Sequence, residues 1–517
     1  MRKIRLLWTD DEIEVLKPHI FFLTEKGYEV DTCSNGTDTI DLVRDNHYDL
    51  IFLDEQMPGL SGIETLKLIR EIRTDIPVVM ITKTEEEGIM EAAIGSEIAD
   101  YLIKPVKPNQ ILLAIKRILD QRRLITEKAT SEYRNEFSRI GNMISGARNY
   151  RDWTKVYRKI VFWESELEKS DDPGMTEIMK LQEAEANNAF ARFIMNNYLT
   201  WINTDNSDKP ILSCNLFSKK IFPEVQPGKS LFFILVDNMR FDQWKTIASE
   251  LTGLYRIIEE DLYYSILPTA TQYSRNSVFA GLMPSAISEM MPDLWVNDDD
   301  DEGKNNYEEE FFKNQLARYG IKYSWSYNKI SSSQEGKKIN GKIRQLLDNQ
   351  INILVYNFVD MLSHARTEIG LIRDLANDER AYRSLTRSWF VNSPLFELVN
   401  ALRTYPVRIV FTTDHGTIRV QNPVKVIGDR KTSSNLRYKT GKNLDYNPRE
   451  VFEIRHPEKA GLPKTNITSK YIFATNKDFL VYQNNFNYYA GYYKDTFQHG
   501  GISMQEMLLP IVSIEPV

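Results

Sequence analysis

The chain has 517 residues and 42% hydrophobic residues, enough for two to four domains with well-formed cores. Lys and Arg number 65 against 72 Asp and Glu, and the net charge of −7 argues against a general nucleic-acid-binding protein, which carries a basic domain or face. Two cysteines, Cys33 and Cys214, cannot build a disulfide framework and indicate a reducing compartment. The charged N-terminus is unlike a signal peptide, and no apolar stretch approaches the roughly 18–20 residues that span a bilayer. We therefore expect a cytoplasmic protein with no membrane span.

Residues 1–120 alternate strand and helix patterns at the spacing of βα units. Apolar strands are expected at 4–9, 49–54, 77–82 and 99–104, and they end on polar side chains, namely Asp10 and Asp11, Asp54, Thr82 and Lys104. The carboxyl ends of parallel strands in a doubly wound sheet lie at one edge, where ligands bind. Clustered carboxylates suit Mg²⁺, while a lysine and a threonine suit a phosphate group. The pattern therefore predicts a phospho-acceptor site.

All of this stretch resembles the receiver domains of two-component response regulators. The resemblance implies a flavodoxin-like fold in which Asp54 accepts a phosphoryl group from a sensor histidine kinase. The residue roles that it implies are Asp10, Asp11 and Asp54 for Mg²⁺, Thr82 and Lys104 for the phosphate, and Tyr101 as the aromatic switch. A plain flavodoxin-like domain with incidental acidic residues is the alternative.

Residues 121–205 show a helical pattern with few breakers. Apolar residues recur at three- and four-residue steps, at Trp153, Val156, Ile160 and Trp163. Such stripes are more often the core of a bundle than a cofactor site. We expect a helical-bundle connector whose first helix runs on from the receiver, and its surface is a plausible dimer interface.

Residues 206–517 contain three apolar runs that each end in an aspartate. The runs are 231–237, 351–360 and 408–414, and they end in Asp237, Asp360 and Asp414. Short β-branched and aromatic runs are typical of buried parallel strands, whose carboxyl ends meet at the ligand-binding edge of a sheet. We therefore expect the three carboxylates to lie together.

Three of the six histidines accompany these aspartates. His364 follows Asp360 by four positions, as on one face of a helix; His415 adjoins Asp414; and His499 opens a His-Gly-Gly turn. Taken alone, each aspartate could be a helix N-cap and His415 an ordinary turn residue. The six together, beside a threonine, predict a two-metal centre in an α/β domain.

Residues 206–517 resemble the alkaline phosphatase superfamily, and within it the PglZ branch. Pro268 and Thr271 match the Pro-x-x-Thr turn of the superfamily's nucleotide pyrophosphatase/phosphodiesterase relatives, and residues 281–284 match their Gly-Leu-x-Pro segment. The resemblance implies that Thr271 is the nucleophile, with Thr269 as the runner-up. It also implies two metal sites, one of Asp237, Asp414 and His415 and one of Asp360, His364 and His499. Mixed Asp and His ligands suit two zinc ions, with manganese as the alternative.

Two other features are open to more than one interpretation. The basic stretch 428–443 includes Arg437 and Lys439, which either grip substrate phosphate or lie on a solvated loop. The tyrosine-rich stretch 481–497 either stacks a nucleobase or packs in a core or an interface.

The order of receiver, helices and PglZ-type domain resembles the PorX-type response regulators. This resemblance implies a regulator of type IX secretion, with a sigma factor or a secretion component as a possible partner. The expected output is a metal-dependent phosphodiesterase acting on linear or cyclic oligonucleotides, controlled by a phosphorylation-promoted homodimer. A non-catalytic scaffold is the alternative. No basic helix-turn-helix follows residue 120, so we expect no binding to duplex DNA.

Overall fold

The computed structural model describes residues 3–73, 76–83, 98–170, 172–204, 208–297, 305–368, 378–428, 433–464, 466 and 468–517. Of residues 120–128, 173 and 364–368 it describes the backbone alone. The chain forms two compact units, Met1–Glu132 with Lys169–Asp172, and Tyr133–Glu168 with Pro173–Val517.

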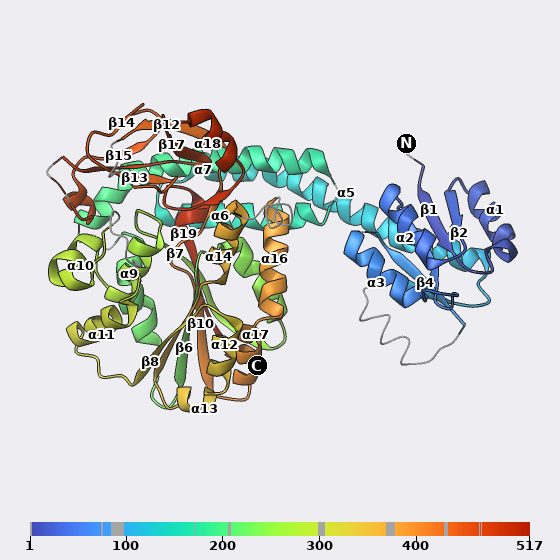
Figure 1. Ribbon diagram of the computed structural model, residues 1–517, viewed down its shortest axis with the longest axis horizontal. Coiled ribbons are helices and arrows are strands. Elements are labelled where there is room, and N and C mark those ends of the chain that lie inside the picture. Colours follow the sequence, from blue (N-terminus) through green and yellow to red (C-terminus); the bar gives the residue numbers. More distant parts are fainter. Residues whose placement is uncertain are drawn as a thin grey trace. The chain divides into compact units, whose positions relative to one another are not determined.

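The first unit is a flavodoxin-like α/β domain (Figure 1). Within its described residues the sheet has the strand order β2-β1-β3-β4-β5, and every pairing is parallel. The strands are β1 (Arg5–Thr9), β2 (Glu29–Cys33), β3 (Leu50–Asp54), β4 (Val78–Thr82) and β5 (Asp100–Ile103). The helices are α1 (Lys17–Glu25), α2 (Gly36–Asp45), α3 (Gly62–Ile72) and α5 (Pro108–Gly146), with a short 3₁₀ turn at Ile13–Leu16.

The strands of this sheet are buried on both faces. Leu6 and Trp8 of β1 pack into one core cluster, and Leu7 between them packs into another. Successive side chains of a strand point to opposite faces, so a continuous apolar run fits a sheet that has helices on both sides. The expected flavodoxin-like class is confirmed.

Three long helices connect the sheets of the chain. α5 runs unbroken from the receiver fold and is followed by α6 (Tyr150–Glu168) and α7 (Pro173–Asn203). The expected stripe on α6 is buried, and Trp153 packs against Phe190 of α7 with ring centroids 5.5 Å apart. These residues therefore form a helical core. No described helix contains a stretch apolar enough to cross a membrane.

The second unit is built on a mixed sheet with the described strand order β7-β19-β10-β6-β9-β8. Its strands are β6 (Ser230–Val236), β7 (Tyr255–Tyr264), β8 (Trp325–Ile330), β9 (Ile351–Tyr356), β10 (Val407–Thr412) and β19 (Leu508–Pro516). β10, β6, β9 and β8 run parallel, whereas β19 is antiparallel to both β10 and β7. The three strands that precede the candidate ligands are thus neighbours in the middle of the sheet.

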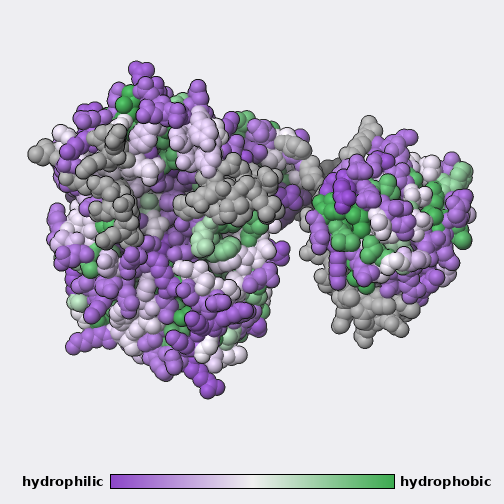
Figure 2. Space-filling view, in the orientation of Figure 1, coloured by the Kyte–Doolittle hydropathy of each residue, from purple (hydrophilic) through white to green (hydrophobic). Residues whose placement is uncertain are grey.

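Helices lie on both sides of this sheet, with α9 and α11 on one side and α16 and α17 on the other (Figure 1). The helices are α8 (Phe241–Glu250), α9 (Thr271–Ala280), α10 (Pro284–Met290), α11 (Glu308–Arg318), α12 (Ser333–Asn340), α13 (Ile343–Leu346), α14 (Phe358–Glu368), α16 (Glu379–Val391), α17 (Pro394–Leu402) and α19 (Met504–Met507). Hydrophilic residues predominate on the face of the larger unit shown in Figure 2.

The chain between β10 and β19 forms several small sheets that are separate from the main sheet. They contain β11 (Ile418–Arg419) with β18 (Phe497–Gln498); β12 (Asn422–Ile427) with β14 (Asp445–Tyr446) and β17 (Asp478–Tyr482); and β13 (Tyr438–Gly441), β15 (Phe452–Ile454) and β16 (Lys470–Phe473). Helix α18 (Phe486–Tyr493) follows β17. The described residues 433–443 of the polar stretch therefore belong to a small folded subdomain rather than to a long loop.

One strand boundary differs from the expectation. β9 ends at Tyr356, and Asp360 lies in the first turn of α14 instead of at the strand end. The apolar run continues past the strand because Phe358 and Val359 begin a helix that packs on the core. An apolar run by itself does not mark where strand changes to helix.

Candidate metal centre

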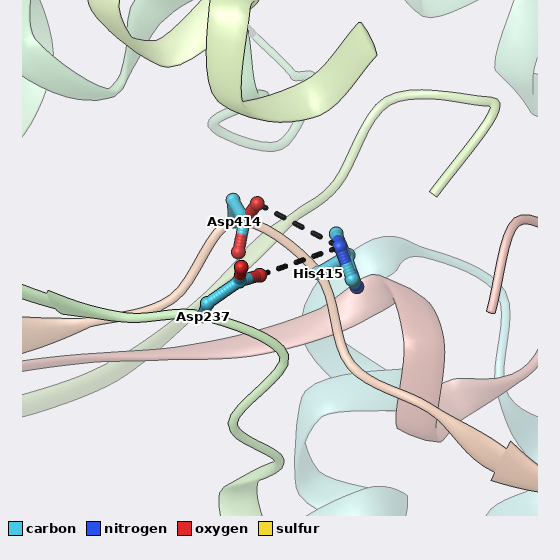
Figure 3. Close-up of side chains that lie close together, drawn as sticks. All are labelled: Asp237, Asp414 and His415. Atoms are coloured by element: carbon cyan, nitrogen blue, oxygen red, sulfur yellow. Dashed lines mark ion pairs between the residues drawn. The ribbon is translucent and has the colours of Figure 1, made fainter. Parts of the chain in front are cut away.

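Two neighbouring parallel strands bring Asp237, Asp414 and His415 together. Leu235 of β6 lies opposite Thr412 of β10, so the chain leaves the two strands side by side. His415 Nε2 lies 3.7 Å from Asp237 Oδ1 and 3.7 Å from Asp414 Oδ2. Figure 3 shows both carboxylates turned toward the imidazole. One ligand atom of each residue fits within 4.8 Å, and all three residues are buried, so the trio can hold one metal ion.

The His415 ring has a fixed orientation. Its Nδ1 lies 3.2 Å from the Gly416 carbonyl oxygen, which can only accept a hydrogen bond. Nδ1 therefore donates to this carbonyl, which directs Nε2 at the space between the carboxylates, where a metal ion would bind it. A Cβ at Gly416 would lie 2.0 Å from the Gln505 carbonyl oxygen, so this turn requires a glycine.

Thr271 lies beside this trio. It is the first residue of α9, and its Oγ is 3.0 Å from His415 Nε2. A helix N-terminus presents unpaired backbone N–H groups and a partial positive charge, both of which favour an anion such as phosphate. Thr269 is instead fully buried, where its hydroxyl donates to the Gly501 carbonyl and accepts from the Gly500 N–H.

A second group of side chains adjoins the first. Asn238 Nδ2 donates to Asp360 Oδ1 at 3.1 Å, and His499 Nε2 lies 3.8 Å from the same oxygen. The rings of His499 and His415 stack with centroids 4.2 Å apart and an interplanar angle of 18°. His364 belongs to α14, but its side chain lies outside the described residues. The structure thus places six of the seven proposed side chains in one neighbourhood.

Arg275 is a member of this site that sequence reasoning missed. It is fully buried, forms an ion pair with Asp237, and donates from Nε to Asp414 Oδ2 at 3.0 Å. Its Nη1 also reaches Glu308 Oε1 at 3.3 Å. The sequence offers one signal, because position 275 is one helical turn after Thr271 and lies on the same face of α9. Arg275 therefore holds both ligand carboxylates in place.

The electrostatics leave an excess of negative charge. Burial opposes ionisation of Asp414, but Arg275 and, to a lesser degree, His415 lower the pKa of Asp414 to about 2. Burial raises the pKa of Asp237 well above its usual value, and the Asp414 and Asp360 carboxylates add to the rise, against the pull of Arg275. Like charges that share a site separate in this way, because one carboxylate ionises at the expense of the other. A bound cation would allow both to ionise.

Arg437 has a different role from the one expected. Its side chain is fully buried and makes a two-pronged ion pair with Glu506, with Nε–Oε1 and Nη2–Oε2 distances of 3.1 and 2.6 Å. Glu506 Oε1 also accepts from the Gly501 N–H at 2.8 Å, within the turn that begins at His499. The expectation that Arg437 grips substrate phosphate is therefore wrong, because its donors brace this turn instead.

Lys439 is also buried, with 1% of its surface exposed, and Nζ donates to the Ser433 carbonyl. It does not lie on a solvated loop. Arg430 and Lys431 of the same basic stretch lie outside the described residues.

The tyrosines of α18 lie at the surface. Tyr488 is 65% exposed and Tyr489 is 39% exposed. Tyr488 stacks on Tyr492, and Tyr489 on Tyr493, in both cases with centroids 6.1 Å apart. Internal packing is therefore wrong for Tyr488, and its ring is accessible to a ligand.

The receiver unit contains a separate acidic site. Ligand oxygens of Asp10, Asp11 and Asp54 fit within 4.8 Å of one another. Lys104 Nζ lies 2.9 Å from Asp10 Oδ2 and 3.0 Å from Asp54 Oδ2. Burial raises the pKa of Asp54 to about 6, although Lys104 opposes the rise. This arrangement can hold a divalent cation next to a carboxylate and a lysine.

Thr82, expected to contact the phosphate, and Tyr101, expected to be the aromatic switch, lie on neighbouring strands. The Thr82 hydroxyl, at the end of β4, donates to Glu55 Oε2 at 2.7 Å. Tyr101 of β5 is 41% exposed, with its ring at the surface. Phosphorylation of Asp54 is expected to expose the surface around residues 83–118 and so to promote dimerisation; residues 84–97 of that stretch lie outside the described residues.

Comparison with known families assigns most of the chain. Residues 6–116 match the response regulator receiver domain, and residues 123–202 match the PorX response regulator linker domain. Residues 216–514 match the BREX system PglZ alkaline phosphatase-like domain. The three matches occur in the order of a PorX-like response regulator.

Individual relatives match the receiver. The transcriptional regulatory protein ResD of Bacillus subtilis is 33% identical over 115 residues, which are 22% of this chain and 48% of that protein. The CpxR homolog of Haemophilus influenzae is 36% identical over 117 residues, 22% of this chain and 50% of that protein. The chain thus spans about half the length of these curated relatives.

Among solved structures, a two-component response regulator from Clostridium difficile is 31% identical. The match covers 23% of this chain and 97% of that one, with a TM-score of 0.22. The PglZ match, residues 216–514, takes up more than half of the 517 residues. The chain therefore belongs to the PglZ family of alkaline phosphatase-like proteins, as a PorX-like response regulator with an N-terminal receiver domain.

Proposed function

We propose that the C-terminal domain is a metal-dependent phosphodiesterase in which Thr271 is the nucleophile. The observation that carries this proposal is the position of the Thr271 hydroxyl. It lies at the N-terminus of α9 and 3.0 Å from Nε2 of His415, a residue that can hold a metal ion with Asp237 and Asp414.

The donor atoms fit a metal ion. Asp237 Oδ1 is buried without a hydrogen-bond partner in the described structure, which is costly for a carboxylate unless a cation binds there. Two carboxylates and one imidazole suit zinc, and also manganese. Asp237, Asp414 and His415 would hold one ion, and Asp360, His364 and His499 the second. When bound, such a pair supplies Lewis acidity and positive charge for the oxygens of the ester.

The protein side chains then set the course of the reaction. Thr271 Oγ loses its proton and attacks phosphorus, a bond forms between them, and the bond to the leaving oxygen breaks as that oxygen takes up a proton and leaves as the alcohol. The N-terminal amides of α9 stabilise the phosphoryl oxygens of the transition state. Water then hydrolyses the phosphothreonine and releases the product. Arg275 keeps Asp237 and Asp414 in place throughout.

The substrate that we propose is a linear or cyclic oligonucleotide. The Pro-x-x-Thr turn at 268–271 resembles that of nucleotide phosphodiesterases, which favours diesters over monoesters. The exposed ring of Tyr488 on α18 offers a surface on which a base can stack.

The receiver domain supplies the control in this proposal. A sensor histidine kinase phosphorylates Asp54 in the presence of Mg²⁺, and phosphorylation promotes a homodimer. We place this activity in the cytoplasm, in the regulation of type IX secretion, with a sigma factor or a secretion component as partner.

The test combines metal analysis with hydrolysis of bis(p-nitrophenyl) phosphate by the full-length protein. Thr271→Ala should lower the rate by at least about 100-fold, since no other hydroxyl occupies its position. Thr269→Ser, which keeps the buried hydroxyl, is the matched control and should retain most of the rate. Full activity of Thr271→Ala would rule out this nucleophile. A metal-loaded protein that hydrolyses neither diesters nor monoesters would favour a non-catalytic scaffold.

A further inference from the structure

A cavity of about 500 Å³ lies in the small-sheet subdomain of the second unit. Strands β12 and β17 and helix α18 form its walls, and Lys439 of β13 also lines it. None of its lining residues belongs to the candidate metal centre. Tyr489, which is 39% exposed, lies on one wall, so the cavity reaches the surface. Its volume is that of a site for a small organic ligand.

Lys439 is the unusual residue of this cavity. Its Nζ donates to the Ser433 carbonyl at 3.1 Å and lies 4.2 Å from the centroid of the Tyr482 ring. The Tyr482 hydroxyl donates to the same carbonyl at 2.8 Å, which fixes the ring beneath the ammonium group. An ammonium group has three N–H donors, so one hydrogen bond leaves donors available to a ligand.

The described lining of the cavity provides no negative charge for this lysine. None of the described lining residues is acidic, and Lys439 forms no ion pair with any described residue. Burial alone lowers the pKa of Lys439 to about 7. A buried ammonium without an anionic partner is costly, and an anion in the cavity would remove that cost.

The other lining residues of the cavity favour a ligand with a flat or apolar part. Leu436, Leu480 and Val426 supply aliphatic surface, and the tyrosines at 482, 489 and 493 supply aromatic surface. Aromatic rings pack on such walls by offset or edge-to-face contacts.

We propose that this cavity binds a small organic anion that carries a planar ring. Its carboxylate or phosphate group pairs with Lys439, and its ring packs against the tyrosine wall. An aromatic carboxylate and a nucleoside monophosphate share this chemistry. The site is separate from the candidate metal centre and does not depend on the proposed hydrolysis.

Calorimetric titration of the full-length protein tests the proposal. Thr271→Ala is used as the background, so that turnover is suppressed and a catalytic failure does not affect the result. The probes are adenosine 5′-monophosphate and 4-hydroxybenzoate, with adenosine and inorganic phosphate as probes that lack the charge or the ring. At least one ring-bearing anion should bind with a Kd below about 1 mM, and both partial probes should bind at least tenfold more weakly.

Two lysine variants locate the binding. Lys439→Met keeps the apolar stem but removes the charge, and it should weaken binding by at least tenfold. Lys442→Met changes an exposed lysine nearby and should leave binding unchanged. Equal binding to Lys439→Met would overturn the proposal. So would the absence of detectable binding of either anion at about 5 mM.

A chemical measurement on the unmutated lysine keeps the test independent of the variants. Acetic anhydride labels neutral amines, and mass spectrometry reports the extent at each lysine. The ring-bearing anion should protect Lys439 and leave Lys442 unprotected. Equal labelling of Lys439 with and without the anion would contradict the proposal.

Discussion

The hydroxyl of Thr271 lies 3.0 Å from Nε2 of His415, although 144 positions separate the two residues in the sequence. The Gly416 carbonyl holds the other nitrogen of the imidazole, Nδ1, independently of Thr271. Removal of the hydroxyl therefore leaves the ring in place, so the roles of nucleophile and ligand can be tested separately.

We expect Thr271→Ala to retain metal and His415→Ala to lose it. His415 contributes one of the ligand atoms of the trio, whereas Thr271 only adjoins it. Loss of the ligand should weaken metal affinity by more than about 100-fold, since loss of supporting residues alone costs 10–100-fold. Elemental analysis and chelator competition measure this effect. Equal metal content in the two variants would contradict the assignment of His415.

Arg275→Met should destabilise the metal-free protein strongly. The change leaves Asp237, Asp414 and Glu308 without their shared positive partner inside the core. Breaking a buried ion pair in this way costs about 3–5 kcal/mol. Urea denaturation measures the change in the free energy of unfolding. Arg344→Met, at an exposed position of α13, is the control and should change it little. Added zinc should recover part of the loss in Arg275→Met.

Arg437→Met should lower stability by about 3–5 kcal/mol, because it leaves the Glu506 carboxylate buried with no cation beside it. KM for a phosphodiester should stay the same, since Arg437 does not face the substrate. A double-mutant cycle with Glu506→Gln should give a coupling energy of about 0.5–3 kcal/mol. A raised KM with unchanged stability would restore a substrate-binding role for Arg437.

Lys439 should make stability depend on pH. Its pKa is about 7 in the folded protein, below the 10.5 of an exposed lysine, so the unfolded chain binds more protons between these values. Stability should therefore rise with pH across this window, by up to about 1.4 kcal/mol per pH unit. The increase in the free energy of unfolding that Lys439→Met causes should be largest at and below pH 7 and should vanish near pH 10.5. Denaturation at several pH values, compared with Lys442→Met, measures the slope. An increase in stability that does not depend on pH would contradict a lowered pKa of Lys439.

Asn187→Ala should weaken the connection between the linker helices and the metal centre. Asn187 of α7 donates to the Gln505 side chain at 3.0 Å and accepts from the Met504 N–H at 2.8 Å, next to Glu506. Leaving these buried groups unpaired costs about 1–3 kcal/mol, and metal affinity should fall with it. Asn196→Ala, at an exposed position of the same helix, is the control. Unchanged metal affinity in Asn187→Ala would exclude transmission through this contact.

The periodicity of the sequence was sufficient to predict most of the sheet strands and the helical linker. Strand ends are set by local patterns, because a buried parallel strand is a short apolar run followed by a turn. Asp54, Asp237 and Asp414 therefore appeared at or just beyond strand ends, as expected from the sequence. Asp360 did not, because the apolar run at 351–359 continues from strand into helix.

Burial was harder to predict than position. Arg275, Arg437 and Lys439 are charged residues that usually lie at a surface, yet each is buried. Their partners Asp414, Glu506 and Ser433 are brought to them by the tertiary fold, and only Ser433 is close in sequence. Sequence patterns carry little information about such long-range pairs.

The position of β19 has a consequence for folding during synthesis. β19 (Leu508–Pro516) lies between β7 and β10 in the sheet, so β7 has no paired neighbour on that side until residues 508–516 leave the ribosome. Long-range pairing of this kind is intrinsically slow. The nascent domain therefore stays open at one sheet edge, with β6, β9 and β10 formed and β7 detached. Chaperone binding to that open edge would protect the nascent domain from aggregation.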